Sequence, residues 1–172
     1  MKFSEPEGAG VAPEPVRPPW TMEVHVLYTG VASTLAALRT AAQFAQGLGA
    51  RIRLLVLETV PYPLPVDRPE HDLAFLRRRF RALVETSALD SAGTPVEATA
   101  EIVLCRGTWE GLEKRLARRS VIVIGRRNNN WRTRALWRWT AEDRLARRLR
   151  SAGHHVVRTS CGVPEHGARS FQ

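Results

Sequence analysis

The segment from Gly125 to Thr140 concentrates residue types that bind anions and flat rings. Its sequence, GRRNNNWRTRALWRWT, holds five arginines, three tryptophans and three consecutive asparagines. A guanidinium group binds a phosphate through two parallel hydrogen bonds, and an indole ring stacks on a nucleobase. A candidate anion site can therefore be drawn from Arg126, Arg127, Arg132 and Arg138.

The same segment has a purely structural interpretation. Trp137 and Trp139 can pack on the edge of a domain while arginines cover them in water, and tryptophan and arginine can hold each other by cation–π contacts. We favour this packed cover over the anion site, because a buried tryptophan needs no ligand to explain it.

The positive charge of the chain is concentrated near this segment. The formal net charge is +9, and ten arginines against Glu142 and Asp143 give residues 126–158 a net charge of +8. Basic charge interleaved with tryptophan is also typical of nucleic-acid-binding proteins. We do not expect nucleic acid as the partner, because the two acidic residues interrupt the patch and no base-reading motif is present. Arginine makes up 24 of the 26 basic residues, which suggests a GC-rich genome.

Alternating strand and helix patterns must position the segment. Short apolar runs predict strands at residues 23–28, 51–60, 95–105, 121–124 and 154–159. The run VIVI at 121–124 is apolar throughout, as in a central strand covered on both faces. Five strands alternating with four helices predict an α/β fold with a single open five-stranded parallel sheet and helices on both faces. This architecture is Rossmann-like.

Each predicted helix carries an apolar face and a boundary signal. The boundary residues are Gly49 after the first helix (32–48), Pro69 in the first turn of the second, Thr108 as the cap of the third, and Thr140 and Gly153 at the two ends of the fourth. The residues expected to be buried are Leu35, Leu38, Ala42, Ala45 and Leu48, then Leu73, Leu76, Phe80 and Leu83, then Trp109, Leu112 and Leu116, and finally Leu145 and Leu149.

Composition changes divide the chain into one domain and two tails. Residues 1–20 hold five prolines and three glutamates, so we expect a disordered Pro-rich tail there. Residues 21–160 form the domain, and residues 161–172 read as a flexible C-terminal tail. No apolar stretch is long enough to span a membrane and no secretory signal is present, so we expect a cytoplasmic protein.

We expect neither a catalytic centre nor a metal site. Cys105 and Cys161 lie far apart, and the adjacent His154 and His155 would point to opposite faces of a strand. His25 is interpreted as a core residue with its hydrogen bonds satisfied, and Cys105 as a buried, inert thiol. No serine–histidine–aspartate or paired-carboxylate arrangement stands out.

The predicted fold places a ligand site beyond the carboxyl ends of the strands. Three segments meet there: the turn after the first strand, the end of the second strand, and the loop that starts at Gly125. The candidate nucleotide- or anion-binding residues are Thr29, Gly30, Val56, Gly125, Arg126, Arg127, Asn128, Arg132 and Thr140.

The order of elements resembles the universal stress protein family. The resemblance covers about residues 22–160 and rests on Gly49-Ala50 before the second strand (LLVLE at 54–58) and on VIVIG at 121–125, followed by a loop and an Arg-rich helix. It implies a five-stranded parallel sheet of the adenine nucleotide alpha hydrolase-like type and a homodimer formed through the last strand. One branch of that family binds ATP and another does not.

The ATP-binding branch carries an acidic residue after the first strand and the motif Gly-x-x-Gly, nine residues, Gly-(Ser/Thr) after the fourth. Here Gly125 matches the first glycine, whereas Asn128 and Arg138 replace the other two and Trp139 replaces the hydroxyl residue. Thr29 occupies the acidic position. The resemblance therefore favours the branch that does not bind ATP.

We thus expect a non-catalytic, universal-stress-like domain that acts in stress response or regulation by dimerisation and by binding a partner or an anion. The alternative is a nucleotide-binding protein that binds ATP or AMP through its Arg-rich loop at 125–140. The second alternative is nucleic-acid binding.

Overall fold

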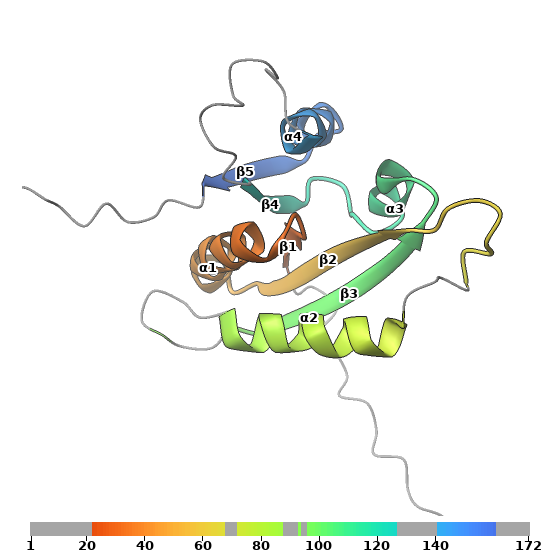
Figure 1. Ribbon diagram of the computed structural model, residues 1–172. Coiled ribbons are helices and arrows are strands. Elements are labelled where there is room, and N and C mark those ends of the chain that lie inside the picture. The colour runs from red at the N-terminus through yellow and green to blue at the C-terminus, as the bar shows by residue number, and fades with distance from the viewer. Residues whose placement is uncertain (1–21, 68–71, 88–92, 94–95, 127–140, 161–172) are drawn as a thin grey trace, which may run out of the picture.

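The computed structural model describes residues 22–67, 72–87, 93, 96–126 and 141–160 (Figure 1). The two predicted tails, at 1–20 and 161–172, lie outside the described residues. The same holds for most of the Arg- and Trp-rich segment, from residue 127 to residue 140.

Strands and helices alternate along the described chain, as predicted. The elements are β1 (Glu23–Leu27), α1 (Val31–Leu48), β2 (Arg51–Thr59), α2 (Leu73–Ser87), β3 (Ala98–Cys105), α3 (Thr108–Glu113), β4 (Val121–Arg126), α4 (Ala141–Ser151) and β5 (His155–Ser160). All neighbouring strands pair in parallel, in the order β3-β2-β1-β4-β5. The predicted fold class, an open five-stranded parallel sheet, is confirmed.

The strand order places α1 and α2 on one face of the sheet and α3 and α4 on the other (Figure 1). Right-handed crossovers put helices on opposite faces when the order of strands reverses, and here it reverses at β1. The carboxyl ends of β1 and β4 are therefore the switch point of the sheet, where the crevice between the two halves opens.

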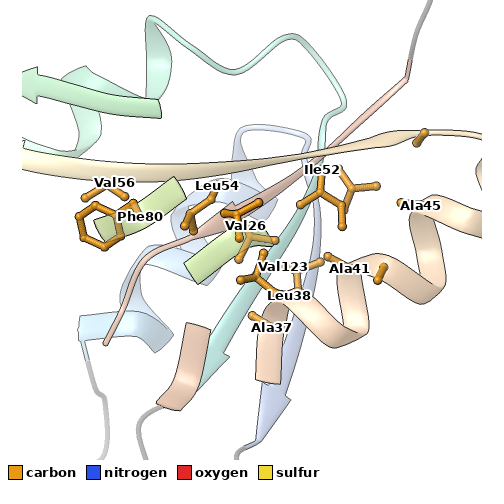
Figure 2. Close-up of a cluster of buried hydrophobic side chains, with 14 residues drawn as sticks. Val26, Ala37, Leu38, Ala41, Ala45, Ile52, Leu54, Val56, Phe80 and Val123 are labelled. Carbon is orange, nitrogen blue, oxygen red and sulfur yellow. The ribbon is translucent and has the colours of Figure 1, made fainter. Parts of the chain in front are cut away.

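The first core packs α1 and α2 against the sheet. Figure 2 shows that Leu38, Ala41 and Ala45 of α1 point toward side chains of the central strands, Ile52 and Val123 among them. Alanine has almost no side chain to accommodate, so α1 lies close to the sheet. Gly49 ends α1 in the left-handed conformation, with φ of 60°, which glycine adopts without steric cost.

The second core, under α3 and α4, is smaller and covers only part of its face. Leu27, Leu55, Ile124, Leu112 and Leu149 are buried there. Toward the amino ends of β1, β2 and β3 the same face carries charged side chains instead, which form a cluster of ion pairs described below.

Several boundaries and burial predictions were wrong. Helix α2 begins at Leu73 rather than near Pro69, because the Asp72 carboxylate accepts hydrogen bonds from the backbone N–H groups of Ala74 and Phe75 at 2.8 and 3.2 Å. Gly107, not Thr108, is the residue that precedes α3. Leu48 is 49% exposed, because it lies in the last turn of α1, beyond the sheet.

Candidate functional site

The turn after β1 is tied to the end of β4 at the switch point. Thr29 Oγ1 donates to the carbonyl oxygen of Gly125 at 2.8 Å and lies 3.0 Å from Ser33 Oγ. The backbone N–H of Thr29 donates to Thr34 Oγ1 at 3.3 Å, and Ser33 Oγ donates to the carbonyl of Gly30 at 3.0 Å. The hydroxyl groups in this turn are thus engaged within the protein.

Gly125 is required by helix packing rather than by a ligand. A Cβ atom at this position would lie 2.0 Å from the carbonyl oxygen of Ser33 and 3.0 Å from its Cβ. Strand β4 therefore passes directly against the first turn of α1. Gly30, with φ of 133°, supplies the backbone conformation that lets α1 start immediately after the turn.

The structure brings three of the sequence-predicted site residues together: Thr29, Gly30 and Gly125. Arg126 is the last residue of β4 and is half-buried. Val56 is buried in the core under α1 and α2. Arg127, Asn128, Arg132 and Thr140 lie outside the described residues.

A cavity of about 430 Å³ opens beside Thr29, between the first turn of α3 and the first two turns of α4. We call it the switch-point pocket. Its lining residues are Thr29, Thr108, Trp109, Ala141, Glu142, Arg144, Leu145 and Arg148. The volume lies within the range of small-molecule sites, roughly 300–1,000 Å³.

The switch-point pocket combines a flat aromatic wall with positive charge. The guanidinium carbon of Arg148 lies 4.0 Å from the centre of the Trp109 ring, in a cation–π arrangement. Arg144 and Arg148 against Glu142 give the lining a net charge of +1. The amino end of α4 also faces this space through Ala141, and a helix dipole places partial positive charge there.

This pocket was not predicted from the sequence. Trp109 and Leu145 were expected only as core residues, and both are in fact half-buried against the core while lining the cavity. Arg148 and Arg144 were counted in the charged patch without a partner. One feature of the sequence could have indicated the pocket: Trp109 follows Gly107 by two residues, just beyond the carboxyl end of β3, where a ligand site is expected.

A cluster of charged side chains lies on the α3/α4 face, away from the pocket. Glu23 Oε1 accepts hydrogen bonds from Arg51 Nε and Arg53 Nη2, each at 2.7 Å. Glu101 accepts from Arg53 at 3.2 Å and pairs with Arg115 at 3.1 Å. Burial acts to raise the pKa of Glu23, but the hydrogen bond from Arg51 and the charges of Arg53 and Arg51 outweigh it, so this pKa falls below its ordinary value of 4.5.

His25 is buried beside this cluster, only 3% exposed. Its Nε2 lies 3.9 Å from Glu23 Oε2, whereas its Nδ1 has no hydrogen-bond partner among the residues that the structure describes. The prediction of a buried histidine is confirmed, but the prediction that its hydrogen bonds are satisfied is wrong. Burial, together with the charges of Arg53 and His154, lowers the pKa of His25 below 6.5, although Glu23 and Glu101 act in the opposite direction.

Cys105 is the remaining candidate nucleophile, and its predicted burial is confirmed. Cys105 is buried, and burial together with Glu110 raises the pKa of its thiol above 9.0. Among the described residues, no group of three or more histidine, cysteine, aspartate or glutamate side chains is placed to hold a metal ion.

Comparison with known proteins rests on structure. No family model and no curated protein matches the sequence. A universal stress protein solved in complex with cAMP superposes with a TM-score of 0.50 and 14% identity, over 82% of this chain and 98% of that one. The fold is that of the universal stress proteins.

Two further structures are similar. One is a universal stress protein from Archaeoglobus fulgidus, with a TM-score of 0.46 and 14% identity over 80% of this chain and 92% of that one. The other is a protein of the universal stress protein family from Burkholderia pseudomallei, with a TM-score of 0.45 and 18% identity over 80% of this chain and 94% of that one. In this version of the universal-stress-protein fold, none of the described helices is both long and apolar enough to cross a membrane.

Proposed function

We propose that the protein is a non-catalytic binding domain, acting in stress response or regulation, which holds a small anionic ligand with a flat ring in the switch-point pocket. One observation carries the proposal: Arg148 stacks over Trp109 at 4.0 Å inside a cavity of about 430 Å³. A planar cation facing an indole ring offers a stacking surface and a bidentate anion donor at one place.

A nucleotide with one negative charge is the ligand class that fits this proposal. The base would stack on the guanidinium of Arg148, which already lies on the Trp109 ring, and the phosphate would bind Arg144 near the amino end of α4, where the lining has a net charge of +1. The neighbour with a TM-score of 0.50 was solved in complex with cAMP, a monoanion, which supports this class. ATP carries more charge and would require further cations, for which the Arg-rich loop at 125–140 is the second candidate.

The state of the potential nucleophiles supports a binding role rather than catalysis. The hydroxyl of Thr29 is bonded to the Gly125 carbonyl, and that of Ser33 to the Gly30 carbonyl. Burial raises the pKa of the Cys105 thiol, which disfavours the reactive thiolate.

We also propose that two copies associate through β5. This strand lies at the edge of the sheet, with half-buried Val156 and Val157 on its two faces. Strand edges are sites of association, and the two copies would pair over the part of β5 that Arg150 does not cap at the Val156 carbonyl. Light scattering across a concentration series tests this part, and a monomer at the highest concentration would refute it.

Titration calorimetry with cAMP, AMP, ADP and ATP tests the ligand assignment. We expect cAMP to bind, and Trp109→Ala and Arg148→Ala each to weaken binding at least tenfold. Arg148→Lys keeps the charge but loses the planar stacking group, so it should also weaken binding.

Arg118→Ala is the matched control, because it removes the same charge from an exposed turn outside the pocket. It should leave affinity unchanged. If none of the four nucleotides binds at millimolar concentration, or if Arg118→Ala weakens binding as much as Arg148→Ala does, the proposal fails.

A further inference from the structure

Strand β3 forms the outer edge of the sheet, alongside α2 (Figure 1). In the described part of the chain its one strand partner is β2, with which it pairs from Ala98 to Cys105. An edge strand presents a row of main-chain groups to its surroundings, and it can accept an added strand unless the protein covers it.

Two hydrogen bonds show which residues of β3 face outward. The N–H of Ile52 donates to the carbonyl of Glu97 at 2.8 Å, and the N–H of Val60 donates to the carbonyl of Cys105 at 3.0 Å. Successive residues of a parallel strand direct their main-chain groups to opposite sides. Because odd-numbered residues face β2, the main-chain groups of Ala98, Ala100 and Ile102 point away from the sheet.

A groove of about 540 Å³ runs along this edge. It is lined by the five consecutive residues 98–102 and, on α2, by Arg77, Arg81, Val84 and Glu85. Side chains of successive strand residues alternate between the two faces of a sheet, so a groove that touches all five follows the edge itself. The small side chains of Ala98 and Ala100 leave the outward main chain accessible.

The opposite edge of the sheet is different. The N–H of His155 donates to the carbonyl of Ser120 at 3.0 Å, so by the same alternation Val156 faces outward from β5. Arg150 Nη2 donates to that Val156 carbonyl at 3.0 Å. A side chain thus caps part of the β5 edge, whereas within the described residues no side chain bonds to the outward groups of β3.

The charged residues of α2 along the groove are spaced at nearly the same distance as alternate residues of a strand. Glu101 is already paired with Arg53 and Arg115. Arg77, Arg81 and Glu85 have no ion pair within the described chain, and they are spaced four residues apart on α2. Four helical residues rise about 6 Å, close to the roughly 6.6 Å between alternate residues of a strand. Alternate side chains of an added strand would therefore meet these three charges in turn.

We propose that the β3 groove binds an extended peptide of a partner protein by strand addition, and that the peptide carries two acidic side chains at alternate positions, followed two positions later by a basic one. The acidic side chains pair with Arg77 and Arg81, the basic one pairs with Glu85, and the peptide main chain bonds to Ala98, Ala100 and Ile102. Main-chain pairing supplies affinity, and the charge order supplies specificity.

The test uses the full chain and a labelled synthetic peptide, Thr-Val-Glu-Val-Glu-Val-Lys-Val-Thr, together with the peptide of reversed sequence, because either strand direction is allowed. We expect saturable binding of one of the two by fluorescence polarisation. A peptide with the charges exchanged, carrying two lysines and then a glutamate, should bind at least tenfold more weakly.

Variants of α2 test the charge contacts. Arg77→Glu/Arg81→Glu should weaken binding of the acidic peptide at least tenfold and strengthen binding of the charge-exchanged peptide. Arg78→Glu is the matched control, because this exposed residue lies on the same helix outside the groove. Equal losses in the control and in the double variant would overturn the proposal.

N-methylation of alternate peptide amides tests strand pairing without altering the protein. Methylation of the alternate amides that face β3 should abolish binding. Methylation of the other amides, which face away from β3, should leave the affinity within about threefold of that of the unmodified peptide. Equal effects in both registers would overturn the proposal.

Two other occupants would be recognised by the same assays. Stronger peptide binding by a Glu5→Lys/Glu7→Lys chain would assign the groove to the protein's own acidic N-terminal segment. A dimer that Arg77→Glu/Arg81→Glu dissociates would assign it to a second copy. Either result would overturn a partner peptide as the occupant.

Discussion

A Cβ atom on Gly125 would lie 2.0 Å from the carbonyl oxygen of Ser33. This contact joins the carboxyl end of β4 to the first turn of α1. Gly125 is also the residue that matches the first glycine of the family's ATP motif. Its lack of a side chain is explained here by the closeness of α1, without reference to a phosphate.

Gly125→Ala should destabilise the protein by about 3 kcal/mol or more, because the added methyl group must push α1 away from β4. Urea unfolding measures the change. Gly47→Ala is the control, since a Cβ there meets nothing within 4 Å and alanine favours the helix by roughly 0.5–1 kcal/mol. A Gly125→Ala protein as stable as the wild type would contradict the packing seen here.

Thr29→Val should cost about 1–2 kcal/mol, because it leaves the Gly125 carbonyl without its 2.8 Å hydrogen bond while keeping the shape of the side chain. Thr29→Ser retains the hydroxyl and should stay close to wild type. The comparison is made by chemical unfolding, and equal losses in both variants would show that the hydrogen bond does not contribute.

Glu23→Gln should cost about 1–3 kcal/mol, because Arg51 and Arg53 would keep their charges at a largely buried position without a carboxylate partner. Glu110→Gln breaks the exposed pair with Lys114 and should cost less than about 0.5 kcal/mol. Urea unfolding at neutral pH measures the loss of unfolding free energy in each variant. Similar losses would contradict the role of burial in the Glu23 cluster.

The pKa of His25 predicts acid sensitivity. Because burial lowers it in the folded protein, the unfolded chain takes up a proton below pH 6.5 that the folded protein does not. Stability therefore falls as pH drops from 7 toward 5, before the carboxylate of Glu23 is protonated.

His25→Gln should flatten the dependence of unfolding free energy on pH between 7 and 5, as measured by urea titration at several pH values. His155→Gln is the control, because His155 is exposed. An unchanged slope in His25→Gln would rule out His25 as its source.

Cys105 should resist thiol reagents in the folded protein. It is 4% exposed and burial raises the pKa of its thiol, so the thiolate is both rare and covered. In a Cys161→Ser chain, modification by Ellman's reagent should be at least a hundredfold slower at neutral pH than in urea. Rapid modification under native conditions would contradict this prediction and would mean that the carboxyl end of β3 opens readily.

The sequence predicted those features that depend on near neighbours along the chain. The apolar run at 121–124, the cap at Gly49 and the acidic first turn of α4 each lie within a few residues, and each was identified correctly. Helix boundaries failed where a competing local signal was overlooked, as at Asp72. The alternation of elements was enough to define the fold class, because parallel strands require crossover helices.

The candidate site depended on tertiary structure. Thr29 and Gly125 are 96 residues apart, and their hydrogen bond arises only because β1 and β4 pair at the switch point. Trp109 and Arg148 come from helices that follow different strands, and nothing in the local pattern of either reveals the other. The sequence by itself determined an Arg-rich α/β chain in which strands and helices alternate, since periodicity and turn residues act locally. The sheet order decided the rest, because it selects which distant side chains share a pocket, an ion pair or an open strand edge.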